Sequence, residues 1–92
     1  MASLIQPERI AIRESLDIIA ARKRGRELAL KIGFSSTEAT LVATAISELC
    51  RNMVLYAKGG ELLLAEARNS KQRGITVVAE DSGPGIKDLR RA

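Results

Sequence analysis

One long amphipathic segment places the strongest constraint on the fold. Between Ser35 and Lys58, apolar residues recur at the helical spacing of three and four, at Val42, Ala45, Ile46, Leu49, Met53 and Tyr56. Ser35 and Glu38 have the spacing of a capping box, and Lys58-Gly59-Gly60 is a typical helix stop. The segment therefore predicts a helix with one buried face, and such a face needs a second layer to pack against.

Upstream of this helix, the sequence predicts a strand and another helix. Ile10 and Ile12 alternate with charged or small residues within residues 8–14, which is the period of a half-buried strand. Apolar and small residues then repeat at three and four over residues 17–32, and Ser15 or Asp17 can cap this helix. Gly25 falls inside its apolar stripe, where it either permits a close backbone approach or is simply tolerated.

Downstream, residues 61–68 and 75–80 predict a β-hairpin. The first segment is rich in Leu and Ala, so its strand assignment rests on the polar loop and the β-rich segment that follow it. Residues 87–92 resemble the first turns of a helix. The order strand, helix, helix, strand, strand predicts a single α+β domain over residues 1–92, with the helices packed on one face of a mixed sheet.

Composition excludes several classes of protein. With 46% apolar and 28% charged residues, the 92-residue chain is expected to be globular. Its single cysteine, Cys50, cannot form an internal disulfide and fits a reducing compartment. The sequence has no signal peptide and no run of eighteen apolar residues, which predicts a cytoplasmic protein without a membrane segment.

The net charge of +4 raises the question of a nucleic-acid partner. We expect none, because Phe34 and Tyr56 are the only aromatic residues and no nucleic-acid-binding motif accompanies the charge. The basic cluster Arg22-Lys23-Arg24, with Arg26, falls mostly on the outer face of its helix. It is either a solvated face or a docking surface for an acidic protein partner.

Two polar motifs are candidates for chemistry. Glu48 and Asn52 lie four residues apart, so they share one helix face, and their predicted place is beside the apolar stripe rather than opposite it. The second motif, Asp81-Ser82-Gly83-Pro84-Gly85-Ile86, predicts a sterically open turn after a strand, where a flat ligand can approach the backbone. Taken alone, Glu48 and Asn52 are more typical of polar residues on a helix margin, and the second motif also fits an ordinary strand-to-helix turn that Asp81 caps.

In this order and separation, the two motifs resemble the GHKL (Bergerat-fold) ATP-binding superfamily. The segments Ala45-Ile46-Ser47-Glu48-Leu49-Cys50-Arg51-Asn52 and Ala79-Glu80-Asp81-Ser82-Gly83-Pro84-Gly85-Ile86 are most similar to RsbT-type switch kinases of stressosomes, within the anti-sigma regulatory factors. The resemblance extends over nearly the whole chain. It implies the Bergerat fold.

The resemblance also implies a role for each motif residue. Asn52 matches the Mg²⁺ ligand, and an amide oxygen suits this hard cation. Glu48 matches the general base, and Asp81 matches the residue that binds the adenine amino group. The segment that lies against the base and ribose corresponds to Gly83, Gly85 and Ile86. The implied reaction is transfer of the γ-phosphate of ATP to a serine or threonine hydroxyl.

The implied partners are STAS-domain scaffold proteins, which such kinases phosphorylate, and a PP2C-type phosphatase, which they activate. Two alternatives stay open: a non-catalytic partner-switching module, and an ATPase domain like that of histidine kinases. The family's lid and second glycine-rich motif, which follow Ile86, have no counterpart in this sequence. We therefore expect an N-terminal portion of such a kinase, inactive alone and weak in ATP binding, that self-associates through surfaces left uncovered.

Overall fold

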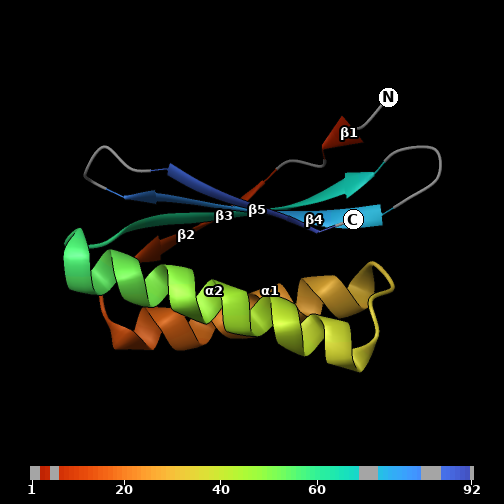
Figure 1. Cartoon of the computed structure of the whole chain (residues 1–92), viewed down its shortest axis with the longest axis horizontal. Helices are drawn as coiled ribbons and strands as arrows, with labels where there is room; N and C mark the ends of the chain where they lie inside the picture. The colour runs from red at the N-terminus through yellow and green to blue at the C-terminus, as the bar shows by residue number, and fades with distance from the viewer. Residues whose placement is uncertain (1–2, 5–6, 69–72, 82–85, 92) are drawn as a thin grey trace.

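The computed structural model describes residues 3–4, 7–68, 73–81 and 86–91. The elements in chain order are β1 (Ser3–Leu4), β2 (Glu8–Ile12), α1 (Ser15–Lys31), α2 (Ser36–Tyr56), β3 (Gly60–Arg68), β4 (Arg73–Asp81) and β5 (Ile86–Arg91). They form two layers, with both helices on the same face of one sheet (Figure 1). The predicted α+β class, the helices on a single face and the β3–β4 hairpin are confirmed.

The sheet is built around β3. Its strands follow the order β1-β3-β4-β5, and β2 pairs with β3 on the same edge as β1. Every pairing among the described residues is antiparallel, so the predicted mixed sheet is wrong. The reason lies in the connection: two helices that run in opposite directions return the chain to the end of β2, where Ile12 pairs with Gly60. A single crossover helix would have produced a parallel pair.

The C-terminal segment also differs from the prediction. Residues 87–92 were expected to begin a helix, but Ile86–Arg91 form β5, which pairs with β4 in the register Val77↔Leu89. The free edge of β4 offers unpaired backbone groups, and pairing with them outweighs the weak helix propensity of a short segment.

Helix α1 packs against α2 through small residues. Glu14 is the N-cap, and its backbone N–H donates to the Asp17 carboxylate (3.2 Å), so Asp17 takes part in the cap and Ser15 is the first helical residue. The buried positions of α1 are Ala21, Gly25 and Ala29. A Cβ placed on Gly25 would lie 2.0 Å from Cδ1 of Ile46. Gly25 therefore permits a close approach of the two helices.

The core lies between the helices and the sheet. Its largest fully buried side chains come from both layers: Ile12, Ile46, Cys50, Leu62, Leu64 and Ile75. Leu64 of β3 is the Cα partner of Val77 in β4, and both side chains are buried. The helix-facing side of the sheet is thus the apolar side, and this face fixes the position of α2.

Candidate functional site

Helix α2 carries the first candidate motif, and local sequence signals set where it begins. The backbone N–H of Glu38 donates to Ser35 Oγ (3.1 Å), while the N–H of Ser35 donates to Glu38 Oε1 (2.8 Å). This is the predicted capping box, which satisfies two backbone donors at the helix start. The buried residues then recur at helical spacing and are Ala39, Val42, Ala43, Ile46, Leu49, Cys50 and Met53.

The buried stripe differs from the predicted one in a way that moves the candidate pair. Ala45 is only half-buried, Tyr56 is 81% exposed, and Cys50 is buried instead. At about 100° per residue, Glu48 and Asn52 lie about 160° and 120° from the centre of the observed stripe. Both side chains are exposed, so their predicted place beside the stripe is wrong. They project from α2 on a side that the described part of the chain leaves open.

The second motif begins where β4 ends. Asp81 is the last residue of β4, and its Cα partner is Gly60, the first residue of β3. Ile86 begins β5 and has Glu80 as its Cα partner. Gly83 and Gly85 lie outside the described residues. The backbone of Asp81 and the start of β5 therefore stand at the end of the sheet where β3 begins.

A tight turn joins α2 to this end of the sheet. The backbone N–H of Ala57 and that of Gly59 both donate to the Met53 carbonyl (3.0 and 2.9 Å). Gly59 has a φ of 102°, and a Cβ there would lie 2.5 Å from the Ile12 carbonyl oxygen. Because α2 turns into β3 within three residues, its last turns lie at the same end of the molecule as Asp81 (Figure 1). The fold thus brings the C-terminal end of α2, which includes Asn52, and the end of β4 to the same end of the sheet.

The described residues hold no ready-made metal cage. No three His, Cys, Asp or Glu side chains among them gather at a spacing that could hold an ion. Mg²⁺ needs only one or two protein oxygens when phosphate oxygens and waters complete its shell. The exposed amide of Asn52 fits that requirement, because it can approach a metal that a nucleotide carries.

Two groups that could suggest other chemistry are structural. Burial raises the pKa of the Cys50 thiol to about 12, so it stays protonated at neutral pH and is no nucleophile. On the open face of the sheet, Arg9 pairs with Glu61 (3.0 Å) and Glu80 (3.7 Å), which links β2, β3 and β4. These side chains are largely exposed, so each pair contributes about 1 kcal/mol or less.

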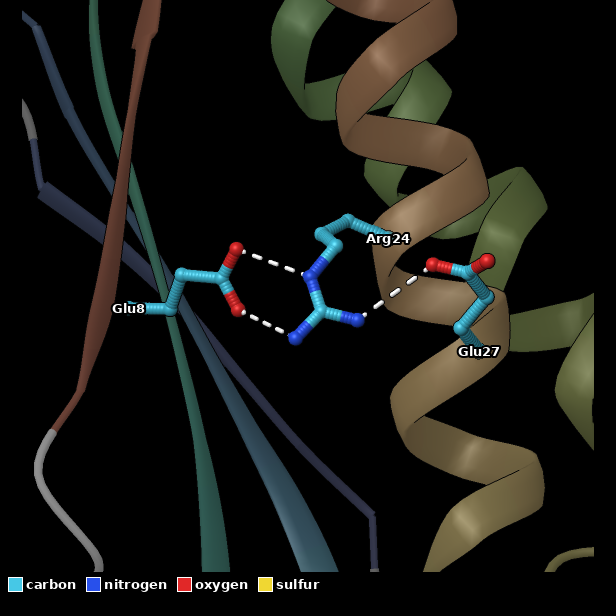
Figure 2. A network of polar contacts seen from close by, with 3 residues as sticks. All are labelled: Glu8, Arg24 and Glu27. Carbon is cyan, nitrogen blue, oxygen red and sulfur yellow. Dashed lines mark hydrogen bonds and ion pairs between the residues drawn. The ribbon is translucent and has the colours of Figure 1, made fainter.

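The basic cluster of α1 is split between two environments. Arg24 binds Glu8 of β2 through Nε and Nη2 (2.9 Å each) and Glu27 through Nη1 (3.3 Å), as Figure 2 shows. The hydrogen bond that Arg24 donates to the Glu8 carboxylate is the main reason why the pKa of Arg24 is raised. Arg24 therefore ties α1 to the edge of the sheet. Arg22, Lys23 and Arg26 make no ion pair with any described residue.

The comparisons with known proteins give one relative. The chain is 40% identical over 82 residues to serine/threonine-protein kinase RsbT of Bacillus subtilis (strain 168), which covers 89% of this chain and 62% of that protein. The chain thus spans less than two thirds of the length of this relative. A match over 82 of 92 residues takes in Glu48, Asn52 and Asp81. No family model and no solved structure matches. None of the described helices is long and apolar enough to cross a membrane.

Proposed function

We propose that this chain is the nucleotide-binding portion of an ATP-dependent serine/threonine protein kinase of the RsbT type, with a Bergerat (GHKL) fold. The observation that carries the proposal is the 40% identity to that kinase over 82 residues, a stretch that takes in Glu48, Asn52 and Asp81. The geometry supports it, because the helix with Glu48 and Asn52 ends beside the strand that ends at Asp81. Sequence similarity and topology therefore point to the same end of the sheet.

In the proposed reaction, the substrate hydroxyl oxygen attacks the γ-phosphorus of ATP, the bond to the bridging oxygen breaks, and ADP leaves. Glu48 accepts the hydroxyl proton, and its exposed position on α2 leaves room for a protein substrate. Asn52 holds Mg²⁺, which neutralises charge on the phosphates. Asp81 accepts a hydrogen bond from the adenine amino group, and the base lies against the segment Gly83, Gly85 and Ile86.

The proposed setting is cytoplasmic partner switching, with STAS-domain proteins as substrates and a PP2C-type phosphatase as the regulated partner. A non-catalytic binding module is the competing proposal. A binding role is favoured by Arg22, Lys23 and Arg26 of α1, which form no ion pair with any described residue. A histidine-kinase-like ATPase is less well supported, since the relative is a serine/threonine kinase and the sequence contains no histidine.

The test is phosphoryl transfer from radiolabelled ATP to a STAS-domain protein, with the natural full-length protein that carries these residues. We expect Asn52→Ala to lower the transfer rate by about 100-fold or more, because charge neutralisation by the metal dominates such reactions. Glu48→Gln should lower the rate while Mg-ATP affinity stays within about 2-fold, since a general base acts on the reacting proton. Thr40→Ala, at an exposed position earlier in α2, is the matched control and should change neither.

Transfer at the normal rate by the Asn52→Ala variant would remove this residue from the metal site. Absence of transfer by the unmodified protein, together with intact binding to the STAS-domain protein, would favour the non-catalytic module. Affinity for Mg-ATP is measured separately by calorimetry. The binding of nucleotide and the chemistry are thus tested independently.

A further inference from the structure

A hollow on the outer side of α1 combines cations with apolar side chains. It has a volume of about 300 Å³ and is lined by Ile19, Arg22, Lys23 and Arg26. These positions are spaced at three and four along α1, so they form one continuous side of the helix. The volume is at the lower end of what small ligand pockets enclose, and suits a few side chains of a partner.

Among the described residues, no carboxylate pairs with the cations of this hollow. Arg24, which lies on another side of α1, is held by Glu8 and Glu27. Arg22 and Lys23, in contrast, form no ion pair with described residues, and Arg26 donates only to the Ser36 hydroxyl (3.3 Å). Three neighbouring positive charges repel one another. A carboxylate-rich ligand would relieve this repulsion.

Exposed apolar residues continue the surface toward one end of the helix pair. Ile19 is 64% exposed and Leu16, three residues earlier, is 70% exposed. The contact of Gly25 with Ile46 fixes the register of the antiparallel helices: Leu16 and Leu55 each lie nine residues from it, toward the same end. Leu55 is 62% exposed. Leu16 and Ile19 thus form an apolar end next to the basic middle of the surface, and Leu55 lies at the same end of the helix pair.

We propose that this surface, defined by Leu16, Ile19, Arg22, Lys23, Arg26 and Leu55, binds an acidic amphipathic helix of a protein partner. Such a helix would place apolar anchors on Leu16, Ile19 and Leu55 and carboxylates on the cations, which is helix-in-groove recognition. A protein is favoured over nucleic acid because the six residues that define this surface offer aliphatic groups and include no aromatic ring for stacking. The inference deepens the proposed function, since it supplies a docking surface for its partners, but binding here requires no nucleotide.

The probe is a phage-displayed library of helical peptides, selected against the chain without nucleotide. We expect the enriched peptides to be acidic, with apolar residues at three- and four-residue spacing. The dissociation constant of the most enriched peptide is then measured by fluorescence polarisation. Arg22→Glu combined with Lys23→Glu should weaken binding by at least about 10-fold, and Ile19→Ser by a similar factor, because apolar anchors dominate such interfaces.

Lys31→Glu is the matched control, because Lys31 is an exposed cation of the same helix outside the hollow. It should leave binding within about 2-fold, and circular dichroism checks that each variant is folded. Enrichment of neutral or basic peptides, no enrichment, or equal weakening by Lys31→Glu would overturn the proposal. So would tighter binding of a single-stranded oligonucleotide or of phosphatidylserine vesicles than of the selected peptide. Because nucleotide is absent throughout, failure here is distinct from failure of the kinase proposal.

Discussion

The contact between Gly25 and Ile46 leads to a quantitative prediction about stability. A Cβ on Gly25 would lie 2.0 Å from Cδ1 of Ile46 and 3.5 Å from its Cγ1, and only the first is an overlap. Ile46 is fully buried, so its terminal methyl cannot move into solvent. On helix propensity alone, Gly25→Ala would stabilise the protein by about 1 kcal/mol. Overpacking at a tight helix contact costs about 1 to 3 kcal/mol.

We therefore expect Gly25→Ala to lower the free energy of unfolding by up to about 2 kcal/mol, because the cost of overpacking offsets or exceeds the gain in propensity. Ile46→Val removes the methyl carbon that causes the overlap, and on its own costs about 0.5 to 1.5 kcal/mol. In the double variant the new methyl group has only ordinary contacts. The gain in helix propensity should then appear, which gives a coupling energy of about 1 to 3 kcal/mol between the two substitutions.

The free energies of unfolding are measured by urea titration followed by circular dichroism. Ala20→Gly, at an exposed position of the same helix, measures the propensity term separately and should cost about 1 kcal/mol. Two outcomes would refute the reasoning: stabilisation of the protein by Gly25→Ala alone, or additivity of the two substitutions within about 0.5 kcal/mol.

Two further predictions concern α2. Ser35→Ala removes the acceptor for the Glu38 N–H and should lower the free energy of unfolding by about 1 kcal/mol in the same titration, whereas an unchanged value would mean that water replaces the cap. The pKa of the Cys50 thiol is about 8.5 in the unfolded chain and about 12 in the folded protein. The contribution of this thiol to stability is therefore constant below about pH 8.5 and is lost as the pH rises from there toward about 12. Between about pH 8 and about pH 10, the free energy of unfolding should fall by about 1 to 2 kcal/mol more in the unmodified protein than in Cys50→Ala, which lacks the thiol. Parallel pH profiles of the two proteins would contradict this.

The parts of the fold that the sequence predicted well rest on local signals. The start of α2 follows from Ser35 and Glu38, whose side chains bond to backbone groups three residues away. The end follows from Gly59, which adopts a left-handed φ of 102°. The β3–β4 hairpin also joins neighbouring segments. Such features depend on a few adjacent residues, so a single sequence contains the information.

Apart from the mixed sheet, the errors concern where a partner surface lies. A periodic pattern shows which residues can be buried but not how far the partner extends, so Tyr56 was assigned to the stripe although burial ends at Met53. The pattern does not mark Cys50 as a core residue, so it places the centre of the buried stripe too close to Glu48 and Asn52. The exposure of Glu48 and Asn52 was therefore underestimated. Likewise, the pairing of β5 depends on the free edge of β4, which residues 86–91 alone do not reveal.

For the candidate site, the sequence indicates the residues, and the structure shows that the elements carrying Asn52 and Asp81 end at the same end of the sheet. Nothing in the spacing of Asn52 and Asp81 requires them to approach each other. The antiparallel helix pair and the turn at Gly59 make α2 end where β4 ends. For the basic cluster of α1, the sequence leaves open a solvated face and a docking surface, and it does not predict the hollow. The separation of Arg24 from the remaining cations became visible only through its contacts with Glu8 and Glu27.

The register Gly60↔Asp81 has a consequence for the fidelity of the site. Side chains alternate between the two faces of a strand, so a slip of one residue between β3 and β4 would turn Leu62 and Leu64 away from the helices. The same slip would move Asp81 relative to the end of α2. A conformer that misplaces this aspartate is therefore also one that loses the core. Because the apolar face of the hairpin is buried only in this register, the packing of the core also fixes where the backbone of Asp81 lies.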